Sequence, residues 1–398
     1  MKCYLIAKKL GHSFSKLIHN ALGSYEYDYK ELSEEELDAF FKEKDFDGLN
    51  VTIPYKQTVM AYLDRISPEA ERIGAVNTIV NRDGVLTGYN TDYYGFCYQI
   101  KEAGATIEGK RVVVLGRGGA SKTVVCVCED MGAKSVRLLT RESNHADFYD
   151  AEIIVNATPV GMYPDTGKSV IDMTNFTSCE AVLDLVYNPA NTKLILDAKR
   201  MGINTANGLG MLVAQAKKAA EIFTDTEIAD SKIAEIKKEI EFKTKNIVLV
   251  GMPGCGKTTV GKILAEKTGK EFCDSDDVIS ASGRTPAEII VSDGEKAFRE
   301  IETDTLSELC KKSCMVVATG GGCVTIEKNH DVLRQNGYVV FIERALEKLA
   351  TDGRPLSVNV EKLWEVREPL YRAAADICVQ SAENPEKTAE EILKRIKG

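Results

Sequence analysis

Residues 251–258 read Gly251-Met252-Pro253-Gly254-Cys255-Gly256-Lys257-Thr258 and decide the fold of the second part of the chain. The apolar run 247–250 precedes them, and residues 259–265 follow with apolar side chains at helical spacing. A strand, a glycine-rich turn and a helix in this order predict a phosphate-binding loop, or P-loop. Its backbone N–H groups can surround a phosphate, its lysine reaches the terminal phosphates, and its threonine hydroxyl suits Mg²⁺. The predicted nucleotide-binding residues are Gly251, Gly254, Gly256, Lys257 and Thr258, with Thr258 also a metal ligand.

The composition is that of an ordinary globular protein of 398 residues, long enough for two or three domains. Its net charge of -9 argues against nucleic acid as the main partner, because neutralising phosphates needs a basic surface. No apolar run approaches the ~20 residues that a membrane-spanning helix needs. The 11 cysteines form no Cys-x-x-Cys pair, and residues 1–4 lead directly into folded-looking sequence. We expect a soluble, cytoplasmic protein that acts on small molecules, as a monomer or a homodimer.

The first part of the chain carries four short polar motifs in a fixed order. Ser13 and Ser15 would point the same way from an extended backbone, and Lys56 follows a strand that ends at a proline. Asn77 stands among small residues, and Asp92 opens a helical stretch. Taken singly, the serines and Asp92 are most simply helix caps, and Lys56 is a solvated charge. Only their occurrence together favours a functional interpretation.

A second glycine-rich turn predicts a dinucleotide site. The buried strand 110–115 leads into Gly116-Arg117-Gly118-Gly119-Ala120-Ser121, and a helix follows. This arrangement sets a pyrophosphate at the N-terminus of the helix.

The end of the next strand, 135–139, bears on the choice of cofactor. There an arginine suits the 2′-phosphate of NADP, whereas an acid suits the ribose hydroxyls of NAD. Arg141 therefore favours NADP, and Arg117 in the turn is a second candidate for the same phosphate. NAD remains an alternative cofactor for two reasons. Glu142 directly follows Arg141, and the simpler interpretation of Arg141 is a solvated surface charge.

The motifs His-Ser-x-Ser, Asn-Val-Thr-x-Pro-x-Lys, Ala-Val-Asn-Thr and Asn-Thr-Asp-x-x-Gly, in this order, resemble shikimate dehydrogenase over residues 1–242. The resemblance implies a substrate-binding domain at 1–94, completed by helices from 212–242, and a Rossmann-like NADP-binding domain at 95–211. It implies that Lys56 and Asp92 form the catalytic pair. The residues implied to bind the substrate are Ser13, Ser15, Thr52, Asn77, Asp92, Tyr187 and Gln215. The residues implied to bind the cofactor are Gly116, Gly118, Gly119, Ala120, Arg141, Gly210 and Met211.

The chain departs from that family's pattern at three places. Lys16 stands where the family has a proline, and Arg117 stands where it has a small residue. Residues 143–150 are too short and polar for the helix that the family places there.

Further on, isoleucines at helical spacing predict a closing helix over residues 226–242.

Polar residues beyond the P-loop suggest a second substrate site. Asp274 and Asp276 would share one side of an extended segment. Glu295, Arg299 and Glu302 would share one helix face, for which a surface ion-pair ladder is the simpler interpretation. A strand at 315–319 then ends in Gly320-Gly321-Gly322, where bare backbone lets a ligand approach.

These motifs, with Arg354-Pro355-Leu356 and Arg367, resemble shikimate kinase, and we place a P-loop kinase domain at 243–398. The resemblance implies that Asp276 accepts a proton from the substrate hydroxyl, that Asp274 helps to hold Mg²⁺, and that Arg354 contacts the transferring phosphate. Lys257 completes the implied catalytic set. The residues implied to bind shikimate are Arg299, Gly321, Gly322 and Arg367. Residues 348–353 lack an arginine that the family often carries before Arg354.

The expected fold is α/β throughout: a substrate domain with a Rossmann-like NADP domain, followed by a P-loop kinase domain with a parallel sheet. The expected function is bifunctional and belongs to aromatic amino acid (chorismate) synthesis. NADPH would reduce 3-dehydroshikimate to shikimate, and ATP with Mg²⁺ would phosphorylate shikimate to shikimate 3-phosphate. The alternatives join an active shikimate kinase to a catalytically weak dehydrogenase, an NAD-dependent quinate-type dehydrogenase or a shikimate-sensing domain.

Overall fold

The computed structural model describes residues 1–10, 13–349 and 360–398. It divides into two compact units. Unit 1 comprises Met1–Val160, Ser169–Tyr187 and Asp197–Glu239. Unit 2 comprises Gly161–Lys168, Asn188–Leu196 and Ile240–Gly398. The domain limits expected from the sequence stay a prediction.

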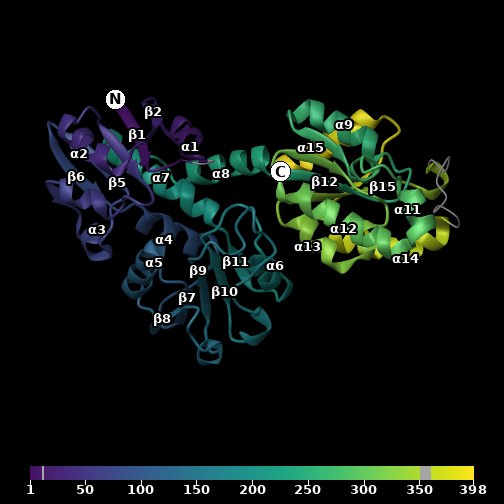
Figure 1. Ribbon diagram of the computed structural model, residues 1–398, viewed down its shortest axis with the longest axis horizontal. Helices are drawn as coiled ribbons and strands as arrows, with labels where there is room; N and C mark the ends of the chain where they lie inside the picture. Colours follow the sequence, from purple (N-terminus) through teal and green to yellow (C-terminus); the bar gives the residue numbers. More distant parts are fainter. Residues whose placement is uncertain (11–12, 350–359) are drawn as a thin grey trace. The chain divides into compact units, whose positions relative to one another are not determined.

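A mixed sheet of six strands begins unit 1, in the order β2-β1-β3-β5-β6-β4 (Figure 1). Its strands β1, β2 and β3 pair in parallel, whereas β5 pairs antiparallel with β3 and with β6. Apolar side chains of β3 and α2 form the core on one face, with Leu49, Phe40 and Phe41 all buried. The elements are β1 Lys2–Ala7, α1 Ser15–Leu22, β2 Glu26–Glu31, α2 Glu34–Glu43, β3 Gly48–Val51, β4 Arg65–Ile66, α3 Pro68–Ile73, β5 Thr78–Arg82 and β6 Val85–Tyr89.

A parallel sheet of five strands follows, in the order β11-β10-β9-β7-β8. Strands β7, β9 and β10 are almost fully buried, which explains why they are continuous apolar runs and do not alternate. Helices α4 and α5 pack against this sheet (Figure 1). The elements are α4 Asp92–Glu102, β7 Arg111–Leu115, α5 Gly119–Asp130, β8 Ser135–Leu139, β9 Ile153–Asn156, β10 Ala181–Asp184, α6 Lys193–Arg200, β11 Asn204–Ala206, α7 Gly208–Thr224 and α8 Ser231–Thr244.

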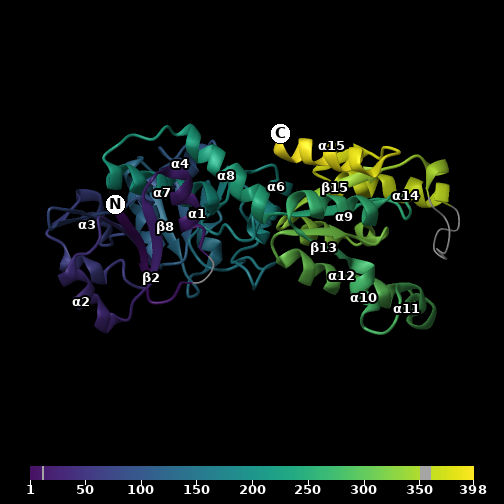
Figure 2. The same cartoon turned by 90° about the horizontal axis from the view of Figure 1, so that it is seen from above.

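Unit 2 is built on a parallel five-stranded sheet in the order β13-β14-β12-β15-β16. Figure 2 shows α9 and α15 on one face of this sheet and α12 on the other. The central strand β12 is buried along its whole length. The elements are β12 Asn246–Val250, α9 Lys257–Thr268, β13 Glu271–Asp274, α10 Ser275–Ser280, α11 Pro286–Asp293, α12 Glu295–Lys311, β14 Met315–Ala318, α13 Glu327–Arg334, β15 Gly337–Glu343, α14 Val360–Ala374, β16 Ile377–Gln380 and α15 Pro385–Lys397.

The expected α/β fold class is confirmed, while two local predictions need correction. The helix expected over 226–242 begins only at Ser231, because Glu221 accepts a hydrogen bond from the Ile228 N–H and holds the preceding residues as a loop. The extended segment expected around Asp274 and Asp276 ends at Asp274, whose carboxylate accepts the N–H of Asp276 and caps α10. Between β8 and β9, a single 3₁₀ turn (His145–Phe148) replaces a helix, as predicted. Within the described residues, every helix is too short or too polar to cross a bilayer.

The start of α7 rests on a close contact that leaves no room for a side chain. A Cβ at Gly208 would lie 2.1 Å from the carbonyl oxygen of Leu185. Because that atom belongs to the backbone, we expect Gly208→Ala to lower the free energy of unfolding by about 2 kcal/mol or more. Gly119→Ala, at the first turn of α5 with no atom within 4 Å, is the matched control and should change it by less than about 1 kcal/mol. Calorimetric unfolding of both variants measures this, and superimposable curves for the two would contradict it.

Candidate active sites

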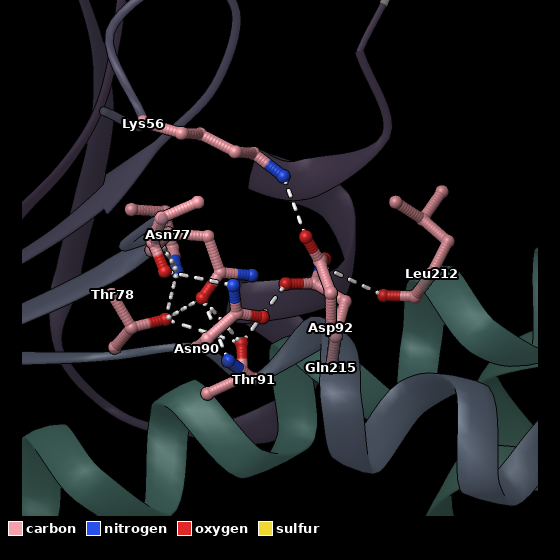
Figure 3. Close-up of polar contacts among 10 residues, drawn as sticks. Lys56, Asn77, Thr78, Asn90, Thr91, Asp92, Leu212 and Gln215 are labelled. Carbon is pink, nitrogen blue, oxygen red and sulfur yellow. Dashed lines mark hydrogen bonds and ion pairs between the residues drawn. The ribbon is translucent and has the colours of Figure 1, made fainter. Parts of the chain in front are cut away.

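In unit 1, Lys56 and Asp92 form an ion pair between a loop and the first residue of α4 (Figure 3). Lys56 Nζ lies 2.6 Å from Asp92 Oδ2. The two side chains are 29% and 16% exposed, so the pair is partly shielded from water but still accessible to a ligand. An acid at this distance fixes the position of the lysine ammonium group, which is the geometry that proton transfer to a nearby oxygen requires.

A buried hydrogen-bond network adjoins this pair and centres on Asn77 (Figure 3). The side-chain oxygen of Asn77 accepts hydrogen bonds from the Thr91 N–H at 2.7 Å and from the Thr78 hydroxyl at 3.1 Å. Thr91 in turn donates to Gln215 on α7, with Oγ1 and Oε1 3.3 Å apart. The network therefore joins Asn77 and Gln215, two of the predicted substrate-binding residues, through Thr91, which directly precedes Asp92 in the chain. Sequence reasoning did not single out Thr91, which the Asn-Thr-Asp motif contains.

The close packing of α4 against α7 brings this network together. A Cβ at Gly95 would lie 2.7 Å from the carbonyl oxygen of Met211. Glycine at this position therefore lets the two helices approach, and Asp92 on α4 comes near Gln215 on α7. This contact gives a physical reason for the glycine of the Asn-Thr-Asp-x-x-Gly motif.

The predicted serines meet at the start of α1. Ser13 Oγ and Ser15 Oγ lie 3.1 Å apart, and the Ser13 hydroxyl also accepts the N–H of Ser15. The ring of Tyr187 lies 5.8 Å from that of Phe14, between the serines in the sequence. Burial raises the pKa of Tyr187, so this phenol stays a neutral hydrogen-bond donor at physiological pH. Thr52 is half-buried directly after β3, where its N–H donates to Ile6.

The glycine turn of unit 1 is open to solvent. Gly116 has φ +94°, and at Gly118 and Gly119 a Cβ would meet nothing within 4 Å. Ala120 in the same turn is exposed. Gly118 caps α5 without a side-chain hydrogen bond, so the first N–H groups of the helix are available to an anion.

Two arginines are predicted to bind a 2′-phosphate here, Arg117 within the turn and Arg141 after the end of β8. Arg117 and Arg141 are both exposed, and their charges help to hold the pKa of Glu142 below its usual range. The main cause of that lowering is the hydroxyl of Thr140, which donates to Glu142 Oε2 at 2.7 Å. The carboxylate of Glu142 is thus held at the end of β8 by Thr140.

Gly210 and Met211 lie on α7, and their packing partners are protein atoms. A Cβ at Gly210 would lie 2.4 Å from Glu102 Oε2 on α4. Met211 is half-buried against the core of the parallel sheet. These contacts explain the small residue at position 210, and the predicted cofactor contact stays a prediction.

In unit 2 the P-loop lines a cavity of about 590 Å³. Gly251, Gly254 and Gly256 all have positive φ, which curls the loop around the start of α9. Lys257 is buried, and its ammonium group donates to the carbonyls of Gly251 and Met252 at 2.8 and 3.1 Å. The Thr258 hydroxyl donates to Asp274 Oδ2 at 2.7 Å. Hydroxyl and carboxylate oxygens are the ligands that Mg²⁺ prefers, so the two predicted metal-binding residues are adjacent and fit that ion.

Asp276, Arg299 and Glu302 line the same cavity. Arg299 donates to Glu302 at 2.7 Å and to Glu295 at 3.0 Å along one face of α12. The prediction that Glu295, Arg299 and Glu302 share one helix face is confirmed. Arg299 is only 7% exposed and Glu302 0%, so these residues do not form the ladder of surface ion pairs that was the simpler interpretation. One carboxylate oxygen of Asp276 and one of Glu302 are buried without a hydrogen-bond partner in the described part of the chain. Burial raises the pKa of both acids, and for Asp276 the charge of Asp274 adds to this.

The glycine run after β14 lies against these polar groups. A Cβ at Gly320 would lie 2.4 Å from Glu302 Oε1, and one at Gly322 would overlap the guanidinium group of Arg299 at 2.1 Å. The Gly321 carbonyl accepts a hydrogen bond from Arg367, with Nη1 and O 3.4 Å apart, and another from Tyr371. The structure thus brings Asp276, Arg299, Gly321, Gly322 and Arg367 together at one cavity. The predicted catalytic Arg354 lies outside the described residues.

The two arrangements define a class of protein: a dinucleotide-binding oxidoreductase joined to a P-loop phosphotransferase. Comparison with known proteins also finds an oxidoreductase domain and a kinase domain. The sequence model described as the shikimate dehydrogenase substrate binding domain matches residues 5–79, and the one described as shikimate kinase matches residues 253–397.

Known relatives and solved structures cover the first part of the chain. The shikimate dehydrogenase (NADP(+)) of Clostridium perfringens strain 13 is 39% identical over 269 residues, which cover 60% of this chain and 97% of the relative. The structure of a chorismate mutase/shikimate 5-dehydrogenase fusion protein from Clostridium acetobutylicum is 36% identical, with a TM-score of 0.56, and covers 60% of this chain and 97% of that one. The shikimate 5-dehydrogenase of Thermus thermophilus, in complex with shikimate, is 30% identical, with a TM-score of 0.54, and covers 60% and 98%.

The chain belongs to the shikimate dehydrogenase family, and it carries a shikimate kinase domain toward its C-terminus. The predictions of a fusion and of two enzyme activities are confirmed.

The raised pKa of Asp276 predicts a pH dependence of the kinase activity. If Asp276 accepts the substrate proton, as the resemblance to shikimate kinase implies, it must be ionised, so activity should be complete above its pKa and fall as the pH drops through it. Because burial raises that pKa, the fall should begin at a higher pH than an ordinary carboxyl group would give. Asp276→Asn should lower kcat by about 10²- to 10⁴-fold. Asp277→Asn, an exposed neighbour, is the control, and equal rates for the two variants at all pH values would contradict this assignment.

Proposed function

We propose that unit 1 reduces 3-dehydroshikimate to shikimate with NADPH, and that unit 2 transfers the terminal phosphate of ATP to shikimate in the presence of Mg²⁺. The observation that carries the first reaction is the Lys56–Asp92 pair beside Asn77 and Gln215. The observation that carries the second is the cavity shared by Lys257, Asp276 and Arg299. Both substrates are small polar molecules, and we propose a cytoplasmic enzyme that acts as a monomer or a homodimer.

Lys56 is the group that moves the proton in the first reaction. NADPH, when bound, supplies the hydride to the ring carbonyl. Lys56, held by Asp92 at 2.6 Å, gives a proton to the carbonyl oxygen or stabilises the negative charge that develops there. Ser13, Ser15, Thr52, Asn77, Tyr187 and Gln215 supply hydrogen-bonding groups for the hydroxyls and the carboxylate of the substrate.

The turn 116–120 and the start of α5 bind the pyrophosphate of the dinucleotide, and Arg141 and Arg117 bind the 2′-phosphate. Supporting this, both guanidinium groups are exposed, while the neighbouring acid, Glu142, is engaged by Thr140. A carboxylate held by its own strand end is a weaker partner for the ribose hydroxyls that NAD presents.

In the second reaction, Asp276 accepts the proton of the attacking hydroxyl. Arg299 and Arg367 bind the carboxylate of shikimate, and the backbone of Gly321 and Gly322 lies against its ring. Lys257 leaves the loop carbonyls that it now contacts and neutralises the terminal phosphates. Thr258 and Asp274 would hold Mg²⁺, which screens the phosphate charge. Arg354 remains the proposed residue that contacts the transferring phosphate.

The first test is NADPH oxidation by the full-length protein with 3-dehydroshikimate and no ATP. We expect turnover, and Lys56→Ala should lower kcat by about 10²- to 10⁴-fold, because proton transfer loses its positioned group. Lys232→Ala is the matched control, since Lys232 is also paired with an acid, Glu235 at 2.7 Å, and is 34% exposed. A folded protein that phosphorylates shikimate but turns over neither NADPH nor NADH would leave a kinase joined to a binding domain.

Cofactor preference gives a separate test. Arg141→Ala and Arg117→Ala should each raise KM for NADPH by about 10-fold or more, because a charge-assisted contact to the 2′-phosphate is lost. KM for NADH should change little, since that cofactor lacks the phosphate. Equal effects on the two cofactors would mean that the arginines bind the pyrophosphate, and a wild-type preference for NADH with quinate would favour a quinate-type dehydrogenase.

A further inference from the structure

The side chain of Arg344 reaches the P-loop cavity from a part of the sequence that carries no nucleotide-binding motif. Arg344 directly follows β15, which pairs in parallel with β12, the strand that leads into the P-loop. The two strands therefore end side by side. A Cβ at Gly251, the first loop residue, would lie 2.6 Å from the carbonyl oxygen of Ile342. The end of β15 thus packs against the first residue of the loop, and the residues that follow β15 lie next to the loop.

The guanidinium group of Arg344 lies at the last glycine of the loop. A Cβ at Gly256 would lie 3.8 Å from Arg344 Nη1. Arg344 also lines the cavity together with Gly254, Lys257 and Thr258. Gly256 is the N-cap of α9, where the backbone N–H groups that surround a phosphate begin.

Arg344 has no hydrogen bond or ion pair with another residue in the described ranges 1–10, 13–349 and 360–398, whereas the other cations of this cavity are engaged. Lys257 binds two loop carbonyls, Arg299 binds two acids, and Arg367 contacts the Gly321 carbonyl. Glu343, the acid next to Arg344, is already paired with Arg372 at 3.0 Å. A half-buried guanidinium group with five donors and no acceptor, close to a buried lysine, makes this end of the cavity a site for an anion.

We propose that Arg344 binds the α- and β-phosphates of the nucleotide in unit 2 and so acts as a further substrate-binding residue of the kinase. The inference rests on the proposed use of ATP. The planar fork of arginine suits two phosphate oxygens at once. Shikimate is a less suitable partner, because Arg299 and Arg367 already gather at Gly321 and Gly322, while Arg344 lies at Gly256.

Calorimetric titration of the full-length protein tests this with two probes, ADP and inorganic tripolyphosphate. Arg344→Ala should weaken the binding of both by about 10- to 100-fold, as expected for loss of a hydrogen-bonded charge. KM for ATP should rise, whereas KM for shikimate and the dehydrogenase rate should stay the same. Arg344→Lys should restore part of the affinity. Arg395→Ala is the matched control, because Arg395 lies in the same unit, pairs with Glu391 at 2.7 Å and is absent from the cavity lining.

The outcomes separate this inference from the proposed function. Unchanged binding of both probes by Arg344→Ala would overturn it. Weaker binding of ADP alone would also overturn it, because the contact would then be with the base or the ribose. A wild-type protein that neither binds ADP nor phosphorylates shikimate would instead refute the proposed kinase reaction itself, and the inference with it.

Discussion

Both candidate sites depend on a glycine whose backbone lies so close to a neighbouring element that no side chain would fit between them. In unit 1 the approach of α4 to α7 at Gly95 sets the Asn77–Thr91–Gln215 network beside the Lys56–Asp92 pair. In unit 2 the bare backbone at Gly320 admits the carboxylates of Asp276 and Glu302. Glycine costs conformational entropy on folding, and here it is placed where polar groups from different elements must converge. The distances within each site follow from these contacts.

The cavity of unit 2 contains buried charged groups whose burial destabilises the fold. An arginine and an acid, Arg299 and Glu302, are both buried, and each has lost most of its hydration. Their mutual hydrogen bond offsets part of that cost, but one oxygen of Glu302 and one of Asp276 have no partner in the described part of the chain. Unpaired buried oxygens destabilise a protein by about 1–3 kcal/mol each. Groups left in that state are suited to a ligand that brings the missing donors, and a polyol with hydroxyl groups does so.

The sequence predicts the framework well because its signals are local. The apolar run before the P-loop and the run at 111–115 are buried strands because both faces of a parallel sheet are covered. Predictions failed where a side chain competes with the backbone. Asp274 ends its strand by capping α10, and Glu221 holds a loop before α8. Arg344 could not be found from spacing, since its place depends on the pairing of β12 with β15, which lie far apart in the sequence.

The two proposed nucleotide sites share one backbone arrangement and differ in how far their positive charges are exposed to water. Each has a parallel strand, a turn with positive φ and the open N-terminus of a helix, at Gly116 in unit 1 and at Gly251 in unit 2. In unit 1 the arginines proposed to bind a phosphate, Arg117 and Arg141, are exposed, so their attraction for it is screened by salt. In unit 2 Lys257 is buried and Arg344 half-buried, so their attraction is screened less. An exposed arginine suits a dinucleotide that is exchanged whole after each hydride transfer. A shielded cation suits phosphoryl transfer, where the charge on the moving group must be neutralised away from water.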